Sequence, residues 1–376
     1  VSQDGGPKDV TSLLHVSDPD PGQTLTWTEI VGPSHGTLTI MDATASSGSE
    51  DIAPGGTVTY QPASGYSGPD SFQIEVSDGY AAATRTIKVT VVAKPAVTSV
   101  AVPADGIYGA GKWLDFKVEF DQEVKVDGTP RLELTIGSKT VYADYVSGTG
   151  TTGLLFRYTV AEGDLDEDGI EVGILDGGSI TNLDGTENAD LTLNLGVTSG
   201  VKVDAVAPSV TGVTSPKDDG AYSVGTVIPI DVTFSEPVIV TGMPQLTLET
   251  GDTDRTADVK SVNGATVTFE YTVQAGDTSA DLDYASAGAL ALNGGAIKDQ
   301  AGNAAVLTLP HPGAAGSLGA NKAIVIDTTA PKVESVDVPA AGTYKAGDAL
   351  TFAVNTDEPV AVDTAGGTPR IKLTIG

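Results

Sequence analysis

One ten-residue pattern occurs three times in this chain, and this repetition limits the fold more than any other feature of the sequence. Gly128–Gly137 reads GTPRLELTIG and Gly367–Gly376 reads GTPRIKLTIG, while Gly242–Gly251 reads GMPQLTLETG between them. Repetition at a long interval is typical of an array of similar modules. The sequence therefore predicts a series of related domains rather than one large domain.

The size of each module follows from a tyrosine that precedes a similar apolar run. Tyr108, Tyr222 and Tyr344 are separated by 114 and 122 residues, which is enough chain for each module to bury a core of its own. Their matched positions favour a structural role. Proline-containing junctions then divide the chain into domains at residues 1–95, 96–205, 206–328 and 329–376, the last being the truncated start of a further domain.

Apolar and polar residues alternate in short runs throughout the chain, as in Ser71–Val76 and Thr86–Val92. This period of two is typical of half-buried β-strands, and 46 glycines and 21 prolines supply turns between them. We find no convincing amphipathic helix. The expected fold class is all-β, with tandem Ig-like β-sandwich domains in an elongated array.

Composition excludes several classes of function. The chain has no cysteine, so disulfides, thiolate metal sites and thiol catalysis are absent. Fifty acidic residues against 20 basic ones give a net charge of −30, which disfavours nucleic acid and anionic lipid as partners. No apolar run reaches the roughly 20 residues of a membrane span, and the residues after Val1 lack the basic and apolar regions of a signal peptide, so we expect any export signal to lie outside this segment. The abrupt start and end predict a piece of a longer chain.

Residues 10–92 carry an ordered set of short motifs. They include VSDPD at Val16–Asp20, GYSG at Gly65–Gly68, DSF at Asp70–Phe72 and VSDG at Val76–Gly79. This set resembles the cadherin-like tandem repeat of large bacterial surface proteins. The resemblance implies an extracellular protein with calcium bound at or near domain junctions.

The later modules share a different set of motifs. Phe234–Val238 reads FSEPV, Phe269–Val273 reads FEYTV, and Gly294–Ile297 reads GGAI; the preceding module keeps FRYTV at Phe156–Val160 and GGSI at Gly177–Ile180. These modules resemble the bacterial Ig-like domain of giant extracellular adhesins, of the RTX type or associated with biofilms. The resemblance again implies a cell-surface location and calcium.

The sharpest local motif for a metal is an acidic loop before a glycine. Asp164, Asp166 and Asp168 alternate ahead of Gly169, as in the opening of a calcium loop, in which oxygens converge on one hard cation. At the twelfth loop position, where an EF-hand has an acidic residue, this sequence has Leu175, so this is not a full EF-hand loop. We expect Ca²⁺ here, against the alternative of a solvated acidic turn; the residues that could supply the remaining oxygen are Glu171 and Asp176.

Acids also precede two of the junctions. Asp204 and Asp327 end their modules just before Ala-Pro or Thr-Thr-Ala-Pro, where they could share a cation with the Glu-Pro-Val turns at Glu236 and Glu358. The alternative is a turn-forming aspartate that accepts a hydrogen bond from its own backbone. The first junction, at residues 94–96, carries a lysine and no acid, so packing must hold it.

A third candidate metal cluster lies in the first module. It comprises Asp18 and Asp20 together with Asp70 and Asp78, and the alternative is a plain polar turn.

The sequence gives little support for a catalytic function. The three histidines are far apart, His35 fits a structural role in a turn, and no nucleophile motif or phosphate-binding loop is present. Trp27 and Trp113 alternate within strands, so both are interpreted as core or pole packing residues rather than sugar-binding platforms.

The expected function is therefore that of a non-catalytic extender: a stalk segment of a secreted or cell-surface bacterial adhesin, stiffened by calcium at acidic turns and domain junctions. Its partners would be neighbouring repeats of the same chain and a glycan or protein receptor bound outside this segment. Two alternatives remain open. One is a glycan- or protein-binding β-sandwich module, and the other is homotypic assembly through unpaired strand edges.

Overall fold

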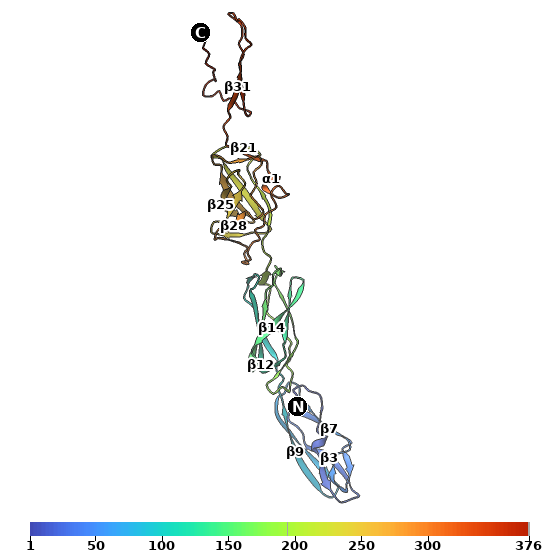
Figure 1. Cartoon of the computed structure of the whole chain (residues 1–376). Helices are drawn as coiled ribbons and strands as arrows, with labels where there is room; N and C mark the ends of the chain where they lie inside the picture. Colours follow the sequence, from blue (N-terminus) through green and yellow to red (C-terminus); the bar gives the residue numbers. More distant parts are fainter. Residues whose placement is uncertain (194, 375–376) are drawn as a thin grey trace. The chain divides into compact units, whose positions relative to one another are not determined.

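A computed structural model describes residues 1–193 and 195–374. Ile375 and Gly376, which end the third copy of the ten-residue pattern, lie outside the described residues. Two compact units divide the chain, Val1–Val206 and Ala207–Gly376. Nearly all regular structure is β, and Figure 1 shows strands in every part of the chain. The prediction of an all-β chain of sandwich domains is confirmed.

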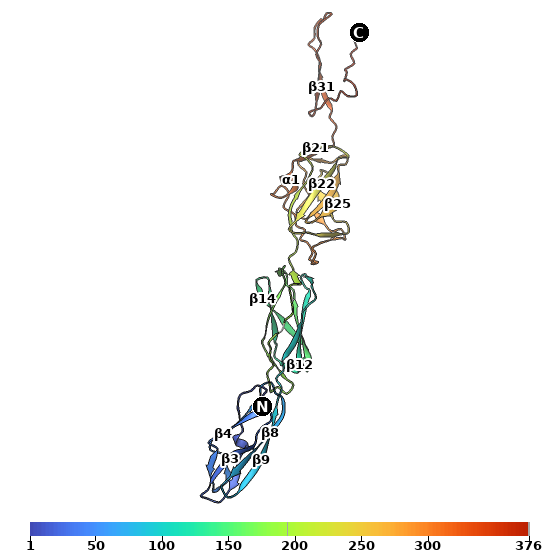
Figure 2. The same cartoon turned by 180° about the vertical axis from the view of Figure 1, so that it is seen from behind.

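The first unit contains two hydrophobic cores, and the first of them comprises buried residues between Val10 and Val91. Its elements are β1 (Lys8–Asp9), η1 (Thr11–Leu13), β2 (Val16–Asp18), β3 (Thr24–Val31), β4 (Gly36–Met41), β5 (Thr44–Ser46), β6 (Ser49–Ile52), β7 (Thr57–Pro62), β8 (Gly68–Ser77) and β9 (Ala82–Val91). One sheet has the order β5-β3-β8-β9 and another the order β1-β7-β4, while β2 pairs with β6. Figure 2 shows β3, β8 and β9 side by side.

The second core comprises buried residues between Val100 and Ala205. The strands around it are β10 (Val97–Ala101), β11 (Gly106–Tyr108), β12 (Trp113–Asp127), β13 (Arg131–Ile136), β14 (Lys139–Ser147), β15 (Thr151–Thr159), β16 (Leu165–Asp166), β17 (Glu171–Asp176), β18 (Ser179–Asn182) and β19 (Val201–Asp204). The main sheet has the order β10-β12-β15-β14-β13-β17, with β18 also paired to β12, and the smaller sheet has the order β11-β19-β16.

The second unit contains the third core, made by buried residues between Val213 and Ile326. Its elements are β20 (Val210–Thr214), β21 (Gly220–Tyr222), β22 (Val227–Phe234), β23 (Ile239–Thr241), β24 (Gln245–Leu248), β25 (Arg255–Asn263), β26 (Thr266–Thr272), β27 (Thr278–Ser279), β28 (Leu290–Ala291), β29 (Ala296–Lys298), α1 (Leu318–Asn321) and β30 (Ile324–Asp327). The main sheet has the order β20-β22-β26-β25-β24-β28 and the smaller one β21-β30-β27, so the second and third sandwiches share one topology.

Only part of the segment after Asp327 forms regular secondary structure. Strands β31 (Val333–Asp337) and β32 (Ala353–Thr356) pair antiparallel. No residue of its described part, 329–374, is buried.

Alternation along each strand explains how these sheets enclose their cores. In β22, Ile228, Ile230, Val232 and Phe234 are all at most 2% exposed, while the residues between them are only partly buried. Side chains of a strand point alternately to opposite faces, so one face of β22 enters the core. Burying four such side chains contributes about 1.5–3 kcal/mol each, relative to leaving them in water.

The repeated pattern has a clear structural reason. Its first glycine adopts a positive φ of 80° at Gly128 and 73° at Gly242. A Cβ added there would lie 3.1 Å from the Cα atom of Gly178 in the second sandwich, and 2.6 Å from that of Gly295 in the third. The pattern therefore brings two backbone segments into contact, and glycine is needed on both sides.

The matched tyrosines have the structural role predicted for them. The hydroxyl of Tyr108 donates to the carbonyl of Ala104 at 2.8 Å, and that of Tyr222 donates to the backbone carbonyl of Asp218 at 2.6 Å. Tyr344 donates in the same way to Ala340. Each tyrosine closes the loop of four residues that precedes it.

Candidate metal sites

The acidic loop of the second sandwich does not gather its carboxylates around one point. Asp164 is only 2% exposed, and its carboxylate accepts hydrogen bonds from the Tyr158 hydroxyl at 2.6 Å, the Ala161 amide at 2.9 Å and Lys139 Nζ at 3.2 Å. Burial by itself would raise the pKa of Asp164, but these hydrogen bonds outweigh it and hold the pKa below its ordinary value. Burial and the same contact raise the pKa of Tyr158 to about 12.

The carboxylate of Asp166 also accepts hydrogen bonds from inside the protein. One carboxylate oxygen accepts from the Gly169 amide and the other from the Gly137 amide, each at 2.7 Å. The loop thus stabilises its own turn and the end of β13. Asp168 and Glu171 are exposed, so a cation here would have to draw mainly on these solvent-facing acids.

Asp176, the other residue proposed to complete that site, lies at the end of β17. Its carboxylate is 3.6 Å from Arg131 and accepts a hydrogen bond from the Gly177 amide at 2.7 Å. Asp176 therefore has an arginine partner of its own, and its role as a ligand stays a prediction.

The corresponding turn in the third sandwich has the same design. Asp277 is 1% exposed and accepts from the Tyr271 hydroxyl at 2.6 Å, the Gln274 amide at 2.8 Å and Arg255 Nε at 2.9 Å. Burial by itself would raise the pKa of Asp277. The hydrogen bonds from Tyr271, Gln274 and Arg255 have the larger effect, so the pKa lies below its ordinary value. The signal in the sequence is a tyrosine six residues before the aspartate in both sandwiches, and the sequence analysis missed it.

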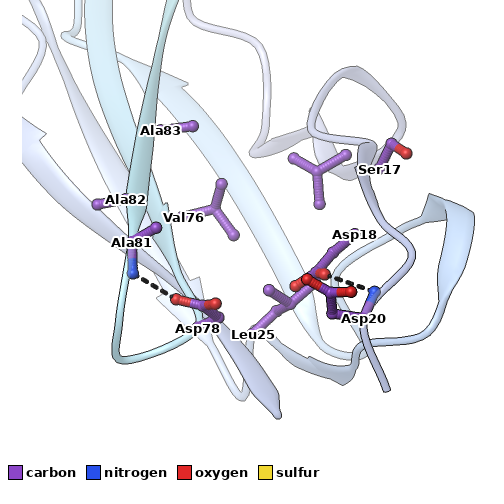
Figure 3. Close-up of a pocket in the computed structure, with 10 residues that line it drawn as sticks. Ser17, Asp18, Asp20, Leu25, Val76, Asp78, Ala81, Ala82 and Ala83 are labelled. Carbon is purple, nitrogen blue, oxygen red and sulfur yellow. Dashed lines mark hydrogen bonds between the residues drawn. The ribbon is translucent and has the colours of Figure 1, made fainter. Parts of the chain in front are cut away.

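In the first sandwich three of the four predicted acids do line one pocket. Asp18, Asp20 and Asp78 face a space of about 310 Å³ whose apolar wall includes Leu25 and Val76. Figure 3 shows Asp78 on one side, where it accepts a hydrogen bond from the Ala81 amide, and Asp18 with Asp20 on the other. Their oxygens are hard ligands of the type that Ca²⁺ prefers, and the pocket leaves room for water to complete the coordination. The three carboxylates do not all have oxygens within 4.8 Å of one another, so a cation here would be held partly through water. The Asp18 carboxylate also accepts a hydrogen bond from the Asp20 amide at 3.2 Å, which is a contact of the polar-turn alternative.

Asp70, the fourth acid, lies elsewhere. It is 8% exposed and accepts hydrogen bonds from the Tyr60 hydroxyl at 2.9 Å and from the amides of Ser34 and His35 at 3.0 Å. Placing Asp70 in the cluster was wrong because its carboxylate is committed to these internal donors. His35 is stacked on Tyr66 with ring centroids 3.9 Å apart, which fits the structural role expected for it.

The junction acids show local turns. Asp204 accepts a hydrogen bond from the Val206 amide at 3.2 Å, and Asp327 accepts one from the Thr329 amide at 2.9 Å. These are the backbone contacts of the turn-forming alternative. Within the first unit, the junction at residues 94–96 contains an ion pair of Lys94 with Asp190 at 3.5 Å, which the sequence analysis did not foresee.

Asp327 also has an acidic neighbour. Partial burial and the nearby carboxylates of Asp327 and Asp357 raise the pKa of Glu358. The repulsion between neighbouring carboxylates disfavours their ionised forms, and a cation between them would relieve it. In the same unit, the carboxylates of Glu236 and Asp299 have oxygens within 4.8 Å of one another. Within either unit taken by itself, the described residues contain no three acidic or histidine side chains with ligand atoms that close together.

The two tryptophans differ. Trp27 is 3% exposed and donates from Nε1 to the Leu14 carbonyl at 3.1 Å, so its interpretation as a core residue is confirmed. Trp113 is 57% exposed, so of the two roles expected for it, core or pole packing, the core role was wrong. It precedes the buried Leu114 in β12 and therefore points to the opposite face of the sheet.

Comparison with known proteins gives a family match over the first sandwich. A family model of the bacterial cadherin-like domain matches residues 1–93. No curated protein matches the chain. Among solved structures, an I-band fragment of titin aligns with a TM-score of 0.35 and 9% identity, over 86% of this chain and 99% of that one. The FN1–FN3 domains of chicken CNTN1 align with a TM-score of 0.21 and 12% identity, over 80% and 94% of the two chains. At these scores the alignments specify neither a fold nor a function.

The described part of the chain contains one α-helix, α1, of four residues, and none that could cross a membrane.

Proposed function

Since residues 1–93 match a bacterial cadherin-like domain, we propose that the chain is a non-catalytic extender segment of a secreted or cell-surface bacterial adhesin. The observation that carries the proposal is that three hydrophobic cores follow one another along the chain, each made from its own consecutive residues. Domains that fold from consecutive residues and are joined through short proline-containing linkers can be added without altering their neighbours. Such an arrangement suits the spacing of other domains.

Calcium is the cation that we propose to stiffen this segment. One candidate site is the pocket of Asp18, Asp20 and Asp78, where three carboxylates line one space and a cation would be held partly through water. The pair Asp327 and Glu358 is another candidate, since a cation there would relieve the repulsion between carboxylates that contributes to the raised pKa of Glu358. Asp204 and the exposed acids Asp168 and Glu171 remain weaker candidates.

The double variant Asp18→Asn/Asp78→Asn tests the pocket in the whole chain. Calcium binding to the folded state alone should stabilise the first sandwich by about 2.7 kcal/mol at a calcium concentration of 100 times Kd. The variant should lose this gain and keep the calcium-free stability. Fluorescence reports on this domain, because Trp27 is buried in its core while Trp113 is already exposed in the native state.

The matched control is Glu29→Gln/Glu50→Gln, which removes two exposed charges from the same sandwich without touching the pocket. Its calcium response should equal that of the wild type. An equal loss of response in both variants would show that calcium acts on net charge only, and the pocket would then not be a calcium site.

A further inference from the structure

A row of alternating charges crosses the main sheet of the second sandwich. Strand register places Asp115 opposite Arg157, Arg157 opposite Asp144, Asp144 opposite Arg131 and Arg131 opposite Asp176, so that the row covers five neighbouring strands. Arg157 donates to both carboxylate oxygens of Asp115, from Nε at 2.6 Å and from a terminal nitrogen at 2.7 Å. The charges of this row are therefore largely neutralised within the row.

Two aromatic rings lie in the next row of the same face. Trp113 pairs with Thr159, and Tyr142 lies opposite Glu133. The guanidinium of Arg157 lies 3.8 Å from the centroid of the Trp113 ring, and that of Arg131 lies 3.9 Å from the centroid of Tyr142.

The exposures show which way the indole faces. The Arg157 side chain is 27% exposed, whereas Trp113 is 57% exposed. One face of the indole thus rests on an arginine that Asp115 holds in place, and more than half of the surface of Trp113 is open to solvent. Trp113 is a fixed aromatic platform rather than a loose surface side chain.

The third sandwich provides an internal comparison, because it has the same topology without this surface. Val227 takes the position of Trp113, and Pro229, which pairs with Glu270, takes that of Asp115. Glu270 lies opposite Asp258. The third sandwich therefore has two acidic residues at the positions that Arg157 and Asp144 occupy in the second. The shared fold is therefore stable without the row and without the tryptophan, and the surface of the second sandwich needs another explanation.

We infer that this face of the second sandwich binds a neutral polysaccharide of β-linked pyranose units, with Trp113 as the stacking residue. The flat C–H face of such a sugar packs against the negative face of an aromatic ring. A polyanion is disfavoured by the net charge of −30, and the paired charges leave little attraction for a cationic partner. Strands β12 and β14, with β15 between them, hold Trp113 and Tyr142 about 10 Å apart, which is a length of about two sugar rings.

The polar side chains complete the site. Asp115 and Asp144 offer carboxylate oxygens, and each arginine keeps at least one N–H group that its ion pair does not use. These groups match sugar hydroxyls, which both donate and accept hydrogen bonds. This role is independent of calcium and of spacing.

Titration of the whole chain with cellohexaose, followed by NMR of the two indole N–H groups, tests the inference. The Trp113 signal should shift saturably, while the signal of buried Trp27 should stay in place. Trp113→Ala should weaken binding by about tenfold or more, as expected for an aromatic residue that anchors a contact. The control Tyr80→Ala removes an aromatic residue that is 91% exposed and lies in the first sandwich, and it should leave binding unchanged.

Three results would overturn the inference. These are the absence of any shift up to the solubility limit of the sugar, equal affinity in Trp113→Ala and the wild type, and binding of the polyanion alginate in preference to cellohexaose. Sedimentation velocity adds a further arm, because a self-association that Trp113→Ala abolishes would assign the face to a second copy of the chain instead. Trp113 is exposed, so retained amide protection in β12 will show that the variant is folded.

Discussion

Asp277→Ala should destabilise the third sandwich by about 3 kcal/mol or more. The alanine would leave the buried hydroxyl of Tyr271, the Gln274 amide and Arg255 without their common acceptor. Hydrogen exchange of the β22 and β26 amides measures this loss locally, which matters because a chain with several cores is not expected to unfold in one step. The first sandwich, with unchanged exchange, serves as a reference in the same sample.

The control for this variant is Asp281→Ala, which removes an exposed acid from the same turn. It should change the stability by no more than about 0.5 kcal/mol. Equal exchange in the two variants would contradict the structural role of Asp277.

Acid should reproduce the effect of Asp277→Ala in the wild type. The pKa of Asp277 is lower in the folded chain than its ordinary value of 3.8, so the folded state favours the ionised carboxylate. The resulting stability is present above about pH 4 and is lost as the pH falls through the lower, folded-state pKa. In Asp277→Ala this part of the pH dependence should be absent, while the parts that arise from Asp70 and Asp164 remain.

Gly242→Ala is expected to have the second largest effect, about 3 kcal/mol. The positive φ of 73° costs a residue with a Cβ about 1–2 kcal/mol. Its Cβ would also lie 2.6 Å from the Cα atom of Gly295, a backbone contact that cannot be relieved by rotating a side chain, and overpacking of this kind costs about 1–3 kcal/mol more. Calorimetry should show the transition of the third sandwich lowered by about 10 °C or more.

Gly225→Ala separates the two causes. Gly225 also has a positive φ, of 84°, but an added Cβ would meet nothing within 4 Å. Gly225→Ala should therefore lower the free energy of unfolding only by the cost of the left-handed backbone, about 1–2 kcal/mol. If Gly242→Ala is no worse than Gly225→Ala, then the close contact between the two glycine segments does not matter for stability.

The repeated sequence features were the most predictive ones. The ten-residue pattern corresponds to β13 and β24 with the turn before each strand, and the matched tyrosines close matched loops. Alternation identifies strands because a pleated strand has a fixed period of two, whatever it packs against. Both signals are local or repeated, so they do not depend on knowing the tertiary fold.

The direction of side chains was harder to predict. An acidic loop such as Asp164–Gly169 has the same sequence whether its carboxylates face a cation or the amides of its own turn, and here Asp164 and Asp166 face inward donors. The prediction that Trp113 is buried failed for another reason. Its large apolar surface favoured burial, but the neighbouring Leu114 occupies the core face of β12. Because adjacent residues of a strand face opposite ways, the sequence did contain the signal that Trp113 is exposed.

Small-angle X-ray scattering of the whole chain, in saturating calcium and then in excess chelator, tests the calcium-stiffened extender most directly. We predict that chelation broadens the distance distribution and shortens its most extended part, because bound cations hold neighbouring domains at fixed angles. Asp327→Asn should reproduce part of that change in the presence of calcium. Identical profiles with calcium and with chelator would contradict the calcium-stiffened extender.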